Sequence, residues 1–113
     1  MSIVVIKPID SRLSDSLRLD AVLNFALENI NYKTINTADQ LKDISGKKLL
    51  FAIDLGDDGI NLEYIKILSK IRSNIDIFNG CTAGIIVNGN GPLYTKSVAS
   101  ELVFAANISG CAF

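Results

Sequence analysis

The polar residues best suited to bind a ligand lie in three loops, each of which follows an apolar run and precedes a helix-patterned segment. The first loop contains Ser11, Arg12, Ser14 and Ser16. Hydroxyl and backbone N–H groups at a helix N-terminus bind anions, and an arginine adds positive charge. This loop therefore predicts a phosphate site. The alternative is that the serines cap an ordinary helix.

The second loop, residues 54–61, combines Asp54, Asp57 and Asp58 with Gly59. Carboxylates there could hold a hard cation such as Mg²⁺. Asp and Gly are also the residues that tight turns favour. We interpret this loop as a turn and predict no metal site.

The third loop, residues 88–97, is the richest in binding groups. Its glycines allow a ligand to approach the backbone, and Tyr94 offers a ring for stacking. Lys96 is expected in the first helical turn, where a lysine opposes the helix dipole unless an anion compensates it. That conflict indicates a ligand, although a solvated lysine after a glycine turn explains the pattern equally well. The candidate binding residues of this loop are Asn88, Gly89, Asn90, Gly91, Tyr94, Thr95 and Lys96.

Alternating apolar runs and amphipathic segments must position these loops. Short apolar runs predict strands at residues 3–6, 32–35, 49–53 and 83–87. Helical spacing predicts helices over 19–30, after an N-terminal cap at Asn61, from Pro92 to Gly110, and a short one over 39–44. The predicted interior residues of the three longer helices are, in chain order, Leu19, Val22, Leu23, Ala26, Leu27 and Ile30; Tyr64, Ile67, Leu68 and Ile71; and Val98, Leu102, Val103, Ala106 and Ile108. The apolar residues 111–113 are interpreted as the start of a fifth strand.

This order predicts one α/β domain over residues 1–113: a three-layer α-β-α arrangement with a parallel sheet of four to five strands, ordered 2-1-3-4-(5). The three loops then lie at the carboxyl ends of neighbouring strands, where α/β folds bind ligands. An incomplete fifth strand would leave one face of the sheet partly bare, which favours a homodimer.

Composition narrows the classes of function. The chain is 49% hydrophobic with a net charge of -1, so it is expected to fold as a soluble globule without a nucleic-acid partner. It has no apolar run long enough for a membrane span and no signal-peptide pattern, so a cytoplasmic location with two reduced cysteines is expected. The absence of histidine excludes Ser-His-Asp and Cys-His catalysis and the usual zinc sites.

The second half of the chain resembles bacterial proteins grouped with NADPH-dependent FMN reductases, which have a flavodoxin-like fold. The resemblance rests on Gly84-Ile-Ile-Val-Asn-Gly-Asn-Gly-Pro-Leu-Tyr-Thr-Lys96, Leu102-Val-Phe-Ala-Ala-Asn107 and Gly110-Cys111. It implies NAD(P)H-dependent redox chemistry with FMN and NADPH as cofactors. It also implies that Ser11, Arg12, Ser14 and Ser16 hold the FMN phosphate, and that the isoalloxazine is flanked by Leu55, Gly56, Asn88, Gly89 and Tyr94.

Two other classes of function fit the same elements. Asp10 and Asp54 follow the first and third strands, where a receiver-like signalling domain places its acidic pocket and its phosphoacceptor; Asp54 would be the acceptor. The third hypothesis is a non-catalytic interaction domain, in which the bare sheet face or the last helix pairs with another copy or subunit.

Overall fold

A computed structural model of the chain describes residues 2–13, 17–89 and 92–113. Ser14, Ser16, Asn90 and Gly91 of the expected site lie outside these ranges. The strands are β1 (Ser2–Ile6), β2 (Asn31–Ile35), β3 (Lys48–Asp54) and β4 (Thr82–Asn88). The helices are α1 (Leu17–Ala26), α2 (Leu62–Ser73) and α3 (Pro92–Ile108), with one 3-10 turn, η1 (Ala38–Gln40).

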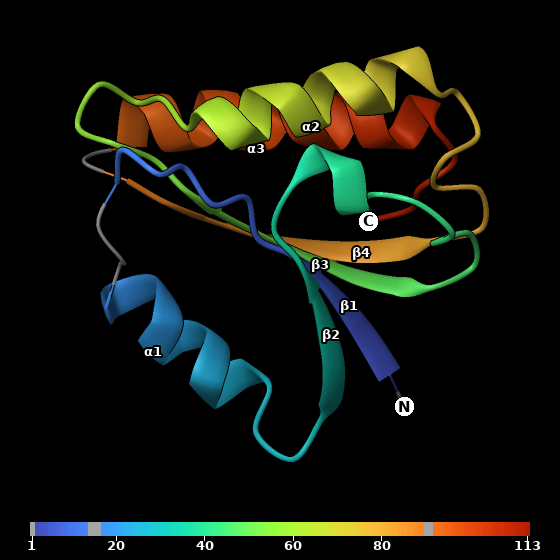
Figure 1. Cartoon of the computed structure of the whole chain (residues 1–113), viewed down its shortest axis with the longest axis horizontal. Helices are drawn as coiled ribbons and strands as arrows, with labels where there is room; N and C mark the ends of the chain where they lie inside the picture. Colours follow the sequence, from blue (N-terminus) through green and yellow to red (C-terminus); the bar gives the residue numbers. More distant parts are fainter. Residues whose placement is uncertain (1, 14–16, 90–91) are drawn as a thin grey trace.

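The four strands are parallel and form one sheet in the order β2-β1-β3-β4 (Figure 1). This confirms the expected three-layer α/β arrangement, which is consistent with a flavodoxin-like fold. The central strand β3 is buried at Phe51, Ala52 and Ile53, as its continuous apolar run predicts for a strand covered on both faces.

The larger core lies between the sheet and the pair α2 and α3, which share one face (Figure 1). The spacing of apolar residues in α2 predicts its buried side chains correctly. Phe51 of β3 meets Phe78 edge to face, with ring centroids 5.6 Å apart. The buried residues of α2 are Tyr64, Ile67, Leu68 and Ile71. In α3 the predicted interior residue Ile108 is exposed, because the stripe that faces the core consists of Leu102, Ala105 and Ala106.

On the opposite face α1 is the only helix that the structure describes (Figure 1). Its predicted apolar stripe is wider than its buried one, which contains Leu19 and Leu23 and continues to Leu27. Val22 is 44% exposed, because one isolated helix buries only the residues directly above the sheet. The helix also ends at Ala26, short of the expected residue 30, because Asn29 has a φ of 62° and turns the chain into β2.

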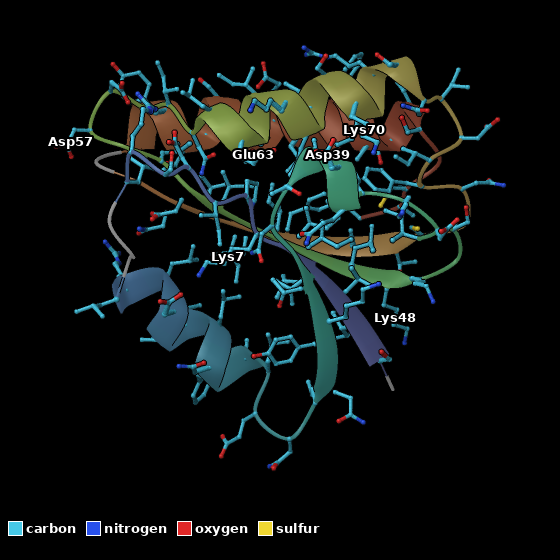
Figure 2. All side chains as sticks on the ribbon, in the orientation of Figure 1. Lys7, Asp39, Lys48, Asp57, Glu63 and Lys70 are labelled. Carbon is cyan, nitrogen blue, oxygen red and sulfur yellow. The ribbon has the colours of Figure 1, made fainter. Side chains whose placement is uncertain are left out.

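The connection between β2 and β3 differs from the expected helix over 39–44, since only η1 forms. Glu63 of α2 accepts a hydrogen bond from the N–H of Ala38 (2.9 Å), and Lys70 of α2 donates one to the Ala38 carbonyl (2.8 Å). Figure 2 shows both side chains beside this turn. Side chains of α2 thus satisfy peptide groups that a longer helix would pair internally. A φ of 58° at Asp43 also breaks the helical path.

The C-terminal residues pair with β4 through a single parallel bridge, Thr82 with Ala112. The amide of Ala112 donates to the Cys81 carbonyl (2.9 Å), and the amide of Ala83 donates to the Ala112 carbonyl (2.8 Å). The interpretation as the start of a fifth strand is therefore confirmed at one residue pair. No helix within the described ranges is long and apolar enough to cross a membrane.

Candidate functional site

The loops after β1, β3 and β4 form one surface at the carboxyl ends of these strands, and Asn61 joins the first two. Its side-chain amide donates to the carbonyl oxygens of Pro8 (3.2 Å) and Asp54 (2.8 Å). Its Oδ1 accepts the amide of Tyr64 (2.9 Å), which caps α2. The cap was predicted from the sequence. The two bridges were not, because one of them spans 53 residues of chain.

Asp10 and Arg12 make the second connection between these loops. The Asp10 carboxylate accepts hydrogen bonds from Nε (3.1 Å) and Nη2 (2.8 Å) of Arg12, and its Oδ2 also accepts the backbone amide of Leu62 (2.8 Å). Asp10 is buried, and Leu62 is the first residue of α2. The Arg12 bonds, followed by the Leu62 amide, hold the pKa of Asp10 well below its usual value. The carboxylate therefore stays ionised in the folded protein.

These contacts change the expected phosphate site. Arg12 is not an isolated cation, because Asp10 balances its charge and fixes its position. Its side chain nevertheless remains 45% exposed, and Nη1 lies 4.0 Å from Oδ2 of Asp58. Ser11 is exposed in the same loop. The structure thus brings Arg12 to the edge of the second loop.

The second loop is a tight turn, as we interpreted it from its residue types. The amide of Gly59 donates to the Gly56 carbonyl (2.9 Å), and Gly59 has a φ of 76°, which favours glycine. Oδ1 of Asp58 accepts the amide of Ile60 (3.1 Å). Asp57 lies at the outer end of the loop (Figure 2). Across residues 2–13, 17–89 and 92–113, no three potential metal-ligating side chains come together.

Leu55 and Gly89 join the second loop to the third. The amide of Leu55 donates to the Asn88 carbonyl (2.8 Å). A Cβ on Gly89 would lie 3.2 Å from Thr95 and 3.3 Å from Leu55, so only glycine fits there without a shift. Leu55 is buried in the core. Its side chain therefore does not face the loop surface, and only its backbone could flank a ligand as the resemblance implies.

Tyr94 of the third loop lies against Gly59 of the second loop, so these two loops are in contact. A Cβ on Gly59 would be 2.5 Å from Cγ of the Tyr94 ring, so the absence of a side chain there admits the ring. The side chain of Tyr94 is still 45% exposed. Lys96 is exposed and occupies the fifth position of α3, which begins at Pro92. It therefore lies beyond the first turn, where the dipole argument for an anion weakens.

Asp54 forms a hydrogen bond across the ends of β3 and β4, because the Asn88 amide donates to its Oδ1 (2.9 Å). Asp10 directs its carboxylate to Arg12 and to the start of α2. A receiver-like pocket needs both acids free to share a cation. The hydrogen bonds that Asp54 and Asp10 already make therefore weaken the receiver hypothesis.

A separate hollow of about 300 Å³ lies between α1 and the edge of β2. Lys7, which follows β1 and is labelled in Figure 2, borders this hollow. Its Nζ lies 2.6 Å from Oδ1 of Asp20 in α1. The other polar side chains that line it are Asn24, Tyr32, Thr34 and Asn36. Sequence reasoning missed this hollow, because its residues come from three elements and share no motif.

Comparison of the chain with protein-family models, with curated proteins and with solved structures found no match.

Proposed function

We propose that this chain binds a small phosphorylated ligand with a planar ring, namely FMN, at the surface formed by the three loops. The observation that carries the proposal is the half-exposed Tyr94 ring, which is held in place by its contact with Gly59. A ring fixed in this way can stack on a flat ligand without losing much side-chain freedom. The resemblance to FMN reductases supports FMN as that ligand.

Arg12 is the proposed contact for the phosphate. Its Nε and Nη2 are bound to Asp10, so the guanidinium is already oriented, while part of the group remains accessible. A preoriented guanidinium loses little entropy when it binds an anion. The weak 4.0 Å approach of Asp58 to Nη1 is the contact that a phosphate would replace.

A bound flavin supplies hydride-transfer chemistry, with NADPH as the proposed electron donor. The contribution of the protein is to position the ligand. Gly56 lies against Leu13 and Asp58, and Gly89 lies against Thr95 and Leu55, so these two glycines let the loops around the proposed ligand pack closely. We place this activity in the cytoplasm, and Cys81 and Cys111 form no disulfide in this structure.

The test is a titration of the purified protein with FMN, followed by flavin fluorescence and by the absorption spectrum. Stacking on Tyr94 should quench the fluorescence at micromolar protein. Tyr94→Ala and Arg12→Gln should each weaken binding about tenfold or more, as loss of a stacking or charged contact of about 1.4 kcal/mol would. Tyr32→Ala and Arg72→Gln are the matched controls, since both residues are exposed and lie on other elements. Unchanged FMN fluorescence with wild-type protein would refute the proposal.

A second copy of this chain is the proposed partner. On the face of the sheet beside α1, Leu50 and Ile86 are only partly buried, and Phe25 of α1 is 82% exposed. Exposed apolar groups of this size mark interaction surfaces. A symmetric dimer would use the same patch on both copies.

A further inference from the structure

Cys81 and Cys111 each lie one residue before the isolated parallel bridge between Thr82 and Ala112. The bridge between Thr82 and Ala112 is defined by the bonds from the Ala112 amide to the Cys81 carbonyl and from the Ala83 amide to the Ala112 carbonyl. In a parallel pair the register continues one residue at a time. One step back from this bridge, Cys81 therefore stands opposite Cys111.

This placement suits a disulfide. Neighbouring strands lie about 4.8 Å apart, and disulfides join residues whose Cα atoms are about 4.4 to 6.8 Å apart. Opposite residues of a parallel pair point to the same face. Both cysteines are buried, and both belong to the apolar cluster beneath α2 and α3.

Glycines precede both cysteines, and one of them, Gly110, brings the two segments into contact. Each cysteine follows a glycine with positive φ, 73° at Gly80 and 98° at Gly110. A Cβ on Gly110 would lie 2.8 Å from the Cα of Asn79, so the two backbones are in direct contact. The amide of Phe78 also donates to the Ser109 carbonyl (3.1 Å). The fold thus holds the backbones that precede the two cysteines against each other.

We infer that Cys81 and Cys111 form a reversible intramolecular disulfide that fastens the C-terminal segment to β4. With a peroxide as oxidant, one thiol is first oxidised to a sulfenic acid with release of water. The second sulfur then attacks it, which forms the S–S bond and releases a second water. Both S–H bonds break, the two sulfurs lose two electrons in total, and the peroxide is reduced. Dithiol reductants reverse the reaction.

The reduced thiols of Cys81 and Cys111 are protected from oxidation while the protein is folded. Burial, together with the neighbouring Cys81, raises the pKa of Cys111 to about 11, so its thiolate is scarce at neutral pH. The Cys81 thiol donates to the Ile44 carbonyl (2.9 Å), and this bond must break when the disulfide forms. Oxidation therefore requires opening of residues 111–113, which pair with β4 at a single bridge.

The experiment treats reduced, folded protein with hydrogen peroxide or oxidised glutathione, then denatures and alkylates it for mass spectrometry. We expect a mass loss of about 2 Da, no alkylation, and a cross-linked peptide pair containing the two cysteines. The melting temperature should rise by about 10 °C and return to its starting value with dithiothreitol. None of these readouts depends on FMN.

Cys111→Ala is the matched variant. It should show no rise in melting temperature after oxidation and should retain one alkylatable thiol. Wild-type protein alkylated at both cysteines before oxidation provides the same control if the variant does not fold. Two alkylated cysteines in oxidised wild-type protein that remains folded by circular dichroism would overturn the inference. Cross-links formed only between chains would do the same.

Discussion

At the scale of single residues, Asp10 makes contacts that the sequence did not predict. It was considered only as an acid of a receiver-like pocket, yet it accepts hydrogen bonds from Arg12 and from the first amide of α2. The second of these contacts spans 52 residues. Residue type and local spacing carry no information about such a contact, because it exists only once β1 and β3 lie side by side.

The low pKa of Asp10 predicts an acid-sensitive fold. The folded state holds the carboxylate ionised, while the unfolded state protonates it near pH 4. The contribution of Asp10 to stability is therefore complete above about pH 4 and is lost progressively as the pH falls toward its folded-state pKa. Melting temperatures of Asp10→Asn should be lower than wild type at pH 7, and the gap should narrow between pH 4 and pH 2.

Asp39→Asn is the control for this measurement, because Asp39 is exposed on η1 (Figure 2). Its melting temperature should follow wild type across the same range. A constant gap between Asp10→Asn and wild type from pH 7 to pH 2 would contradict the role assigned to the ionised carboxylate.

At the scale of elements, the sequence predicts all four strands to within one residue at each end, because continuous apolar runs bounded by polar residues leave little choice. The Asn61 cap of α2 could be predicted too, because it joins residues only three positions apart in the sequence. The expected helix over 39–44 failed for the opposite reason: Glu63 and Lys70 of another element satisfy the peptide groups of Ala38. The loop surface was located correctly by topology, whereas the burial of Leu55 could not be read from residue type.

Substitution of Gly110 tests the turn that connects α3 to the C-terminal segment. Gly110→Ala should lower the free energy of unfolding by about 3 kcal/mol, because it combines a positive φ with a Cβ placed against the backbone of Asn79. Gly46→Ala is the matched control. Gly46 also has a positive φ, but a Cβ there meets nothing within 4 Å, so about 1 kcal/mol is expected. Urea denaturation measures both, and equal losses would show that the contact with Asn79 contributes nothing.

At the scale of the whole molecule, the two faces of the sheet are unequally covered. Helices α2 and α3 with η1 bury most of the core on one side, and α1 lies by itself on the other among the described residues (Figure 1). The sequence anticipated a partly bare face from the short fifth strand. It did not show which side chains remain accessible, since exposure depends on where α1 crosses the sheet.

The proposed homodimer predicts a mass twice that of the monomer by light scattering at high protein concentration. Phe25→Ser should shift the population toward monomer, because it removes an apolar side chain from the proposed contact. Phe104→Ser is the matched control, since Phe104 is 68% exposed but lies on α3, on the opposite face. A wild-type monomer, or equal dissociation of both variants, would exclude this surface as the interface.

The amide of Asn61 also has a consequence for how the loop surface is assembled. Its partners are Pro8, which follows β1, and Asp54, which ends β3, so these two strands must already be paired before the side chain can reach both carbonyls. The contact with Pro8 spans 53 residues, and contacts this distant in sequence form slowly because the loop between the partners must close first. The surface should accordingly be absent from partly folded chains, so a ligand of this surface would bind only to fully native molecules. Binding capacity would then serve as a direct assay of the native fraction during refolding.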